Sequence, residues 1–200
     1  HHDGVIRTFT SATCKQVLDA ILLGFDPVPY TAYVNDVDGD TALSVWLLRN
    51  PKKASLLAVQ KLVEVVGAID AHGPAYPCSD PALASAFYDW AMAPERDARR
   101  NKSYGTISLE QLLEQCVENI GRLIEEGPGK FAMMTKATAS YVITHTHPRF
   151  VMARADGFVF GELYKDGYRV AVAYRQLNDG SYEYTIGKQS SFVDFPLGPH

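Results

Sequence analysis

Apolar residues in the first two thirds of the chain recur at intervals of three and four, which is the spacing of amphipathic helices. This spacing predicts helices at residues 11–23, 41–49, 52–66, 80–92 and 108–126. Boundary signals support two of them, because Asp80 and Pro81 suit a helix start and Ser108 opens a capping-box pattern. Between the helices, Thr31–Val34 predicts a short strand, and the charged segment 94–106 predicts a mobile loop.

Beyond about residue 130 the apolar positions alternate with polar ones, which is typical of β-strands. This alternation predicts strands at residues 140–145, 150–155, 158–164, 168–175 and 181–186. Turn sequences that favour β-hairpins separate most of them, namely Asp156-Gly157, Asp166-Gly167 and Asn178-Asp179-Gly180. The predicted C-terminal part is therefore antiparallel and distinct from the helical part before it.

Together these patterns predict an α/β protein with an N-terminal mainly parallel sheet and flanking helices. A linker helix and a smaller, β-rich α+β domain complete the predicted fold. The expected boundaries are 1–106 for the α/β domain, 107–129 for the linker helix and 130–200 for the C-terminal substrate-binding domain. Gly127-Pro128-Gly129 marks the end of the linker helix, because this sequence cannot continue a helix.

Composition narrows the class of protein. The chain has 200 residues, 46% of them hydrophobic, and a net charge of −4, which argues against a protein that coats nucleic acid. No apolar run approaches the ~20 residues of a membrane helix, and no signal peptide is evident, so we expect a cytoplasmic protein without a membrane partner. Three widely spaced cysteines predict buried free thiols. The start at His1-His2 suggests either missing preceding residues or a tag remnant.

The main candidate for chemistry is the acidic loop Asp36-Val37-Asp38-Gly39-Asp40, which lies between a predicted strand and a predicted helix. Sites in open α/β sheets lie beyond the carboxyl ends of strands. Three carboxylates this close repel one another unless a cation neutralises them, and hard oxygen ligands suit Mg²⁺ or Mn²⁺. The alternative is a solvated acidic turn in which one aspartate caps the following helix, and Asp40 is well placed for that role.

A second candidate segment contains Asp70 and His72 in a predicted turn after an apolar stretch. A carboxylate and an imidazole two residues apart can point into one site, and a histidine shifts metal preference toward Mn²⁺. We expect Asp70 or His72 to come close to the acidic loop. The alternative is that His72 only caps the preceding helix.

A strand, an Asp-x-Asp-x-Asp loop, an apolar helix and a later Asp-x-His turn resemble the DHH phosphoesterase superfamily. The resemblance rests on residues 35–40 and on Ile69-Asp70-Ala71-His72-Gly73. It implies a DHH domain, a linker helix and a C-terminal domain that binds substrate. It also implies a catalytic and metal-binding set of Asp36, Asp38 and Asp40, joined by Asp70 and His72 as metal ligands, with Mn²⁺ or Mg²⁺ activating water for attack on phosphorus.

The chain departs from that family in two respects. The Asp-His-His triplet is reduced to Asp70 and His72, and the C-terminal glycine-rich motif is missing, so the chain is either cut before it or divergent. The expected partner is a phosphate-containing small molecule or a short oligonucleotide. A homodimer is a further alternative. Candidate phosphate contacts are Arg99, Arg100, Lys188, Ser190 and Ser191. His145 and His147 alternate on a predicted strand and should face the same side.

Two other functions remain open at this point. Asp36-Val37-Asp38-Gly39 resembles the nucleophile motif of haloacid-dehalogenase-like phosphatases, in which the first aspartate attacks phosphorus and the second is the acid and base. Asp40 interrupts the sequence expected next in that motif. The third function is a non-catalytic DHH-like binding protein, which the missing second histidine favours.

Overall fold

The computed structural model describes residues 10–73, 79–131, 140–155 and 159–189. The chain divides into two compact units. The first unit comprises His1–Ala71 and Cys78–Thr135, and the second comprises His72–Pro77 and Lys136–His200. Each unit is described by itself below.

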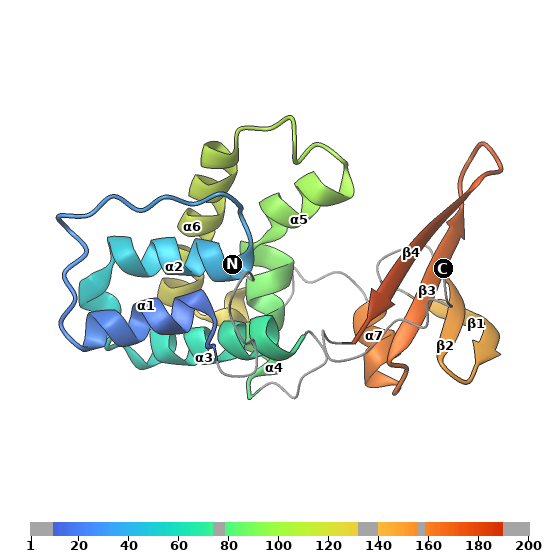
Figure 1. Cartoon of the computed structure of the whole chain (residues 1–200), viewed down its shortest axis with the longest axis horizontal. Helices are drawn as coiled ribbons and strands as arrows, with labels where there is room; N and C mark the ends of the chain where they lie inside the picture. Colours follow the sequence, from blue (N-terminus) through green and yellow to red (C-terminus); the bar gives the residue numbers. More distant parts are fainter. Residues whose placement is uncertain (1–9, 74–78, 132–139, 156–158, 190–200) are drawn as a thin grey trace. The chain divides into compact units, whose positions relative to one another are not determined.

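The described part of the first unit is helical (Figure 1). Its α-helices are α1 (Thr13–Leu22), α2 (Gly39–Arg49), α3 (Leu57–His72), α4 (Pro81–Ser85), α5 (Ala93–Arg100) and α6 (Leu109–Glu126). Short 3-10 segments lie at η1 (Pro51–Lys53) and η3 (Pro128–Lys130), and a π-helical segment, η2 (Ala86–Ala91), continues α4. Side chains cap two helix starts as predicted, because Asp80 accepts a hydrogen bond from the Leu83 N–H (2.9 Å) and Ser108 accepts one from Gln111 (3.3 Å).

Helix α2 forms the centre of this unit. Every residue from Ala42 to Leu47 is buried, so α2 has no polar face, and it packs against α1 and α6 (Figure 1). The buried Ser44 satisfies its hydroxyl by donating to the Asp40 carbonyl (2.7 Å). Helix α6 contributes six buried residues, including Ile120 and Leu123, to the same core. The helix predicted as a linker is therefore part of the first unit's packing.

The sequence-based prediction for this part differs from the structure in several elements. The described residues 10–73 contain no strand, and Thr31–Val34 is exposed and irregular, so they do not show the predicted N-terminal parallel sheet. The helix predicted at residues 52–66 is α3, which continues past residue 66 to His72 and so has Asp70 and His72 in its last turn. The segment predicted as a mobile loop contains α5. This helix begins at Ala93 and has Pro94 in its first turn, where proline is tolerated.

The second unit is a four-stranded mixed sheet with one helix. Its elements are β1 (Tyr141–His147), β2 (Phe150–Ala155), α7 (Phe160–Lys165), β3 (Val170–Gln176) and β4 (Tyr182–Lys188), and the strand order is β1-β2-β3-β4. β1–β2 and β3–β4 are antiparallel, whereas β2–β3 is parallel. The parallel pair requires a crossover connection, and α7 lies in it.

The prediction of a strand at residues 158–164 is therefore wrong. Phe160, Leu163 and Tyr164 have helical spacing and are all buried in the core of this unit. Gly167 (φ +92°) ends α7 instead of turning a hairpin, since its N–H donates to the Tyr164 carbonyl (3.1 Å). The predicted Asp156-Gly157 turn lies outside the described residues. The hairpin at Gly180 is confirmed by the antiparallel pairing of β3 with β4.

The two faces of the sheet differ. Small residues line the face under α7 and leave room for its rings; they are Ala153, Ala155, Ala171, Ala173 and Gly187. A Cβ atom at Gly187 would lie 2.5 Å from the Phe160 ring. The opposite face, here called the open face, carries His147, His145 and Val142 of β1, Met152 and Arg154 of β2, Val172 and Tyr174 of β3, and Tyr182, Tyr184, Ile186 and Lys188 of β4.

Two further findings concern the described residues alone. None of their helices is both long enough and apolar enough to cross a membrane. Cys14 and Cys116 are buried free thiols, as predicted.

Candidate functional site

The acidic loop precedes α2, and its middle aspartate caps that helix. Asp38 has extended backbone angles, and its Oδ1 accepts a hydrogen bond from the Thr41 N–H (2.7 Å). The prediction of Asp40 as a well-placed cap of this helix is wrong by two residues, because Asp38 is the N-cap. The Asp38 side chain is exposed, so it reaches solvent while holding the helix start.

Asp40 instead caps the neighbouring helix α1. Its Oδ2 accepts from the Thr13 N–H (2.9 Å) and its Oδ1 from the Cys14 N–H (2.7 Å). The two N–H groups are among those that a helix start leaves without an intrahelical partner. One carboxylate in the first turn of α2 thus fixes the N-terminus of α1, which explains its charge without a metal ion.

Asp36 is held by three donors. Its Oδ1 accepts from the Arg99 guanidinium (2.8 Å), the Val37 N–H (2.8 Å) and the Tyr104 hydroxyl. Partial burial works to raise the pKa of Asp36, but these hydrogen bonds and the Arg99 charge outweigh it and hold the pKa below its ordinary value. Arg99 also pairs with Glu95 and stacks on the Tyr104 ring at 4.0 Å. Arg99, predicted as a phosphate contact, is therefore engaged within the first unit, whereas Arg100 is exposed at the end of α5.

Asp70 lies within electrostatic range of the acidic loop. Burial raises the pKa of Tyr88 far above its usual value, and the charges of Asp70, Asp40 and Asp38 add to the shift. Burial likewise raises the pKa of Cys14, with contributions from Asp40 and Asp70. The carboxylates of Asp38, Asp40 and Asp70 and the thiol of Cys14 therefore lie within electrostatic range of Tyr88. His72, the last residue of α3, is exposed.

Glu95 extends this group on the other side of Asp38. Burial raises the pKa of the Glu95 carboxyl, Arg99 opposes the shift, and the charges of Asp36 and Asp38 add to it. Asp38 is thus the carboxylate shared by the Glu95 side and the Tyr88 side. Glu95 and Tyr88 were not among the predicted site residues, because neither belongs to a motif and both come near the loop only in the folded chain. The name acidic corner is used below for Asp36, Asp38, Asp40, Asp70 and Glu95.

The acidic corner was tested for its fit to a divalent cation. Among the residues that the structure describes, no group of three or more His, Cys, Asp or Glu side chains is arranged to hold a metal ion. Mg²⁺ makes a smaller demand, because it commonly binds one or two carboxylates and completes its shell with water and substrate phosphates. Asp38 and Asp70 are exposed carboxylates of that kind. The donor set fits Mg²⁺ better than a cage built around His72.

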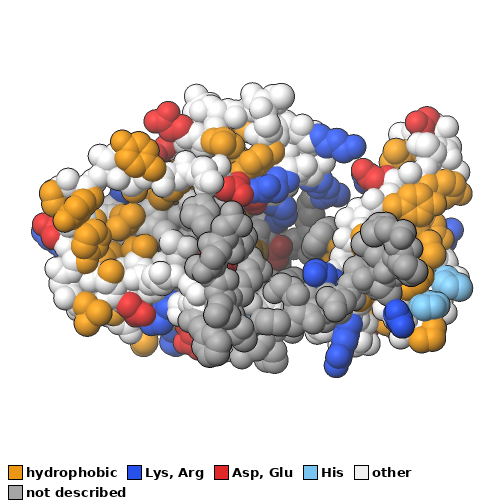
Figure 2. Space-filling model, in the orientation of Figure 1, with side chains coloured by type: hydrophobic (Ala, Val, Ile, Leu, Met, Phe, Trp, Pro, Cys, Tyr) orange, Lys and Arg blue, Asp and Glu red, His pale blue; other side chains and the backbone are white. Residues whose placement is uncertain are grey.

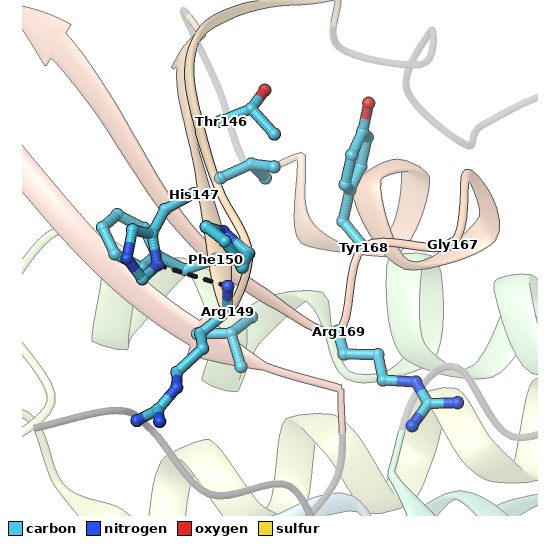
Figure 3. A pocket seen from close by; sticks show the side chains of 10 residues that line it. Thr146, His147, Arg149, Phe150, Gly167, Tyr168 and Arg169 are labelled. Carbon is cyan, nitrogen blue, oxygen red and sulfur yellow. Dashed lines mark hydrogen bonds between the residues drawn. The ribbon is translucent and has the colours of Figure 1, made fainter.

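The predicted phosphate contacts of the C-terminal part lie in the second unit. Lys188 is the last residue of β4 and pairs with Val170 at the start of β3, while Ser190 and Ser191 lie outside the described residues. At the same rim, a hollow of about 540 Å³ is lined by His147, Arg149 and Arg169 among others. In Figure 3 the Arg149 and Arg169 side chains extend away from each other, to the lower left and the lower right, and the dashed line marks the Arg149 N–H donating to His147 Nδ1 (3.2 Å).

His145 and His147 face the same side of the sheet, as predicted. The register places His145 opposite Met152 and His147 opposite Phe150, after an irregularity that follows Ile143. The His147 ring packs against Phe150 with centroids 4.9 Å apart.

Comparison with known proteins adds nothing to this geometry, since no family model, curated protein or solved structure matches the chain.

Proposed function

We propose that the chain is a metal-dependent phosphoesterase that hydrolyses a phosphodiester or phosphoanhydride at the acidic corner. Asp38 and Asp70 would hold Mg²⁺ or Mn²⁺, and Asp36 and Asp40 would keep the loop in place. One observation carries the proposal: the exposed Asp38, at the N-cap of α2, and the exposed Asp70, in the last turn of α3, both lie within electrostatic range of Tyr88. Carboxylates that share one region in this way repel one another less when a cation binds.

The surrounding residues have distinct roles in this proposal. Tyr88 is protonated at neutral pH, as any ordinary tyrosine is, and burial and the nearby carboxylates raise its pKa further, so it adds a neutral hydroxyl to the corner instead of another negative charge. The Cys14 thiol is also kept protonated, which removes a thiolate ligand from consideration. A bound divalent cation would supply positive charge to phosphate oxygens and lower the pKa of a coordinated water. Arg100 is the exposed cation of α5 that remains for a phosphate.

The haloacid-dehalogenase-like alternative has less support. It requires Asp36 as a nucleophile that is free to attack phosphorus. In this protein Asp36 accepts hydrogen bonds from Tyr104, Arg99 and the Val37 N–H, and no strand precedes it among the described residues. A non-catalytic role for the acidic corner remains the competing outcome of the experiment below.

The experiment compares Asp38→Asn and Asp70→Asn with the wild type. Hydrolysis of bis(p-nitrophenyl) phosphate and of a short oligonucleotide is measured with Mg²⁺ and with Mn²⁺, together with thermal stabilisation by each metal. Each variant should lose activity and metal stabilisation, while asparagine keeps an acceptor for the Thr41 N–H at the α2 cap. Asp97→Asn, which changes an exposed carboxylate of α5, is the control. Wild-type protein without activity or metal stabilisation would contradict the proposal.

A further inference from the structure

The open face of the second unit combines exposed rings with positive charge. Tyr182, Tyr184 and Ile186 of β4 are 51%, 56% and 59% exposed, and Val142 of β1 is 55% exposed. Figure 2 shows hydrophobic side chains gathered over β3 and β4. Side chains of this kind cost free energy when they face water, so an exposed group of them marks a binding surface.

The strand register arranges these side chains in rows across the sheet. One row runs Val142, Arg154, Tyr174 and Tyr184, with one residue from each strand in turn. A second row, His145, Met152, Val172 and Ile186, lies beside it. Along each strand, successive residues of this face are about 6.6 Å apart, because each residue of a strand advances about 3.3 Å. The flat side chains of Tyr174, Tyr182 and Tyr184 therefore lie together at one end of this face, beside aliphatic residues.

The three tyrosine rings of this face pack against one another, and one pair of them is stacked. The rings of Tyr174 and Tyr184 are stacked with centroids 5.8 Å apart, and Tyr182 lies 6.1 Å from Tyr174 and 6.3 Å from Tyr184. Residues of two neighbouring strands form this cluster, so each ring restricts the movement of the next. An ordered aromatic platform loses little conformational entropy on binding.

Charge selects the ligand. Arg154 and Lys188 belong to the open face, and Arg149, Arg169 and His147 line the hollow at its rim. The carboxylates that the structure describes in this unit lie elsewhere: Glu162 and Asp166 in and after α7, Asp179 in the β3–β4 turn, and Glu183 paired with Arg175 on the α7 side. A face that carries Arg154 and Lys188 and none of the described carboxylates favours an anionic partner, although the whole chain carries −4.

We propose that this open face binds single-stranded nucleic acid, with bases stacked on Tyr174, Tyr182 and Tyr184 and phosphates near Arg154, Lys188 and the rim arginines. Aromatic side chains on a four-stranded sheet hold unpaired bases in this way, since every base has a face that can stack. A duplex hides those faces, so it should bind more weakly. This binding surface would give the proposed phosphoesterase a single-stranded nucleic acid as its substrate class. Binding itself does not depend on hydrolysis.

The test measures binding of fluorescein-labelled dT15 and rU15 by anisotropy in EDTA, so a failed phosphoesterase does not affect the result. A 15-base-pair duplex, which is also negatively charged, serves as the competitor. Tyr184→Ala should weaken single-strand binding about 5- to 150-fold, the range of one lost base stack, while Tyr184→Phe should keep it. Arg154→Glu should weaken binding and reduce its salt dependence.

Matched controls lie in the first unit. Tyr33→Ala removes a tyrosine that is 92% exposed, and Lys61→Glu reverses an exposed cation of α3; both should bind like the wild type. Photocrosslinking of wild-type protein to 5-iodouracil oligonucleotides should label the peptide that contains Tyr182 and Tyr184, which needs no variant to fold. Absence of binding, equal duplex binding, or self-association that Tyr184→Ala abolishes would each overturn the proposal.

Discussion

The acidic corner of the first unit and the open face of the second use their polar and aromatic side chains in opposite ways. In the acidic corner, Asp36, Asp38 and Asp40 each accept hydrogen bonds that hold a helix start or a neighbouring side chain. On the open face, the Tyr184 ring packs against neighbouring tyrosine rings, and both Tyr184 and Ile186 are more than half exposed to solvent. A dense motif can therefore serve the fold, and a surface without any motif can be free to bind.

This difference has a physical origin. A carboxylate beside the N-terminus of a helix gains from unpaired N–H groups and from the helix dipole, so it is stabilised without a ligand. An exposed tyrosine gains nothing comparable until another flat group covers it. Changes that separate fold from binding should therefore have different effects in the two regions, and the predictions below use stability as the measure.

The largest effect is expected on the covered side of the sheet. Gly187→Ala places a Cβ about 2.5 Å from the Phe160 ring and 2.6 Å from the Tyr164 hydroxyl, so the helix or the strand must shift. We expect a loss of about 1–3 kcal/mol in the free energy of unfolding, the usual cost of overpacking. Urea unfolding followed by tyrosine fluorescence measures it.

The adjacent residue is the control, because it belongs to the open face. Ile186→Thr keeps a β-branched side chain at a position that is 59% exposed, so its effect should stay within about 0.5 kcal/mol. Equal losses for Gly187→Ala and Ile186→Thr would mean that the open face is packed in solution, and the comparison between the two faces would then fail.

A smaller effect is expected at the cap of α1. Asp40→Ala removes the acceptor of two backbone N–H groups, those of Thr13 and Cys14, and should cost about 0.5–2 kcal/mol. Asp38→Asn should cost far less, since asparagine also caps helices well and loses one charge from a crowded group. Unfolding followed at 222 nm reports on this helical unit. A larger loss for Asp38→Asn would reverse the structural roles assigned to the two residues.

Local signals explain what the sequence predicted well. The helix starts at Asp80 and Ser108 depend on residues three positions away, so the caps can be read directly from the sequence. The strand at 150–155 was predicted with its observed bounds, Phe150–Ala155, because its buried residues alternate. Thr31–Val34 has strand propensity as well, but it is exposed and a strand needs a partner that propensity cannot supply.

Ambiguous signals explain the errors. Asp-Gly turns hairpins, but a glycine with positive φ also ends helices, which is what Gly167 does. Phe160, Leu163 and Tyr164 fit helical spacing in a stretch rich in strand-forming residues. Arg99 and Tyr104, which donate hydrogen bonds to Asp36, lie more than 60 positions away in the sequence. The sequence around Asp36 therefore could not show that this carboxylate is held by hydrogen bonds within the fold. The alternation of tyrosines in β4 can be seen in the sequence. The sequence does not show which face of the sheet α7 covers.

The smallest effect is expected at Asp36 and depends on pH. Folding lowers the pKa of this carboxyl, so its ionised form stabilises the protein above the unfolded pKa of about 3.9, and this contribution is lost as pH falls through the lower folded pKa. Asp36→Asn should therefore be less stable than wild type at pH 5–7, and the difference should shrink below about pH 4. Asp36 and Arg99 side chains are each 45% exposed, so the difference at neutral pH should stay below about 1 kcal/mol. Tyr104→Phe removes one donor to Asp36 and should reduce the effect of Asp36→Asn when both changes are combined. A difference that persists undiminished at pH 3 would show that Asp36 acts through its shape and not through its charge, and it would remove the electrostatic part of the contrast between the acidic corner and the open face.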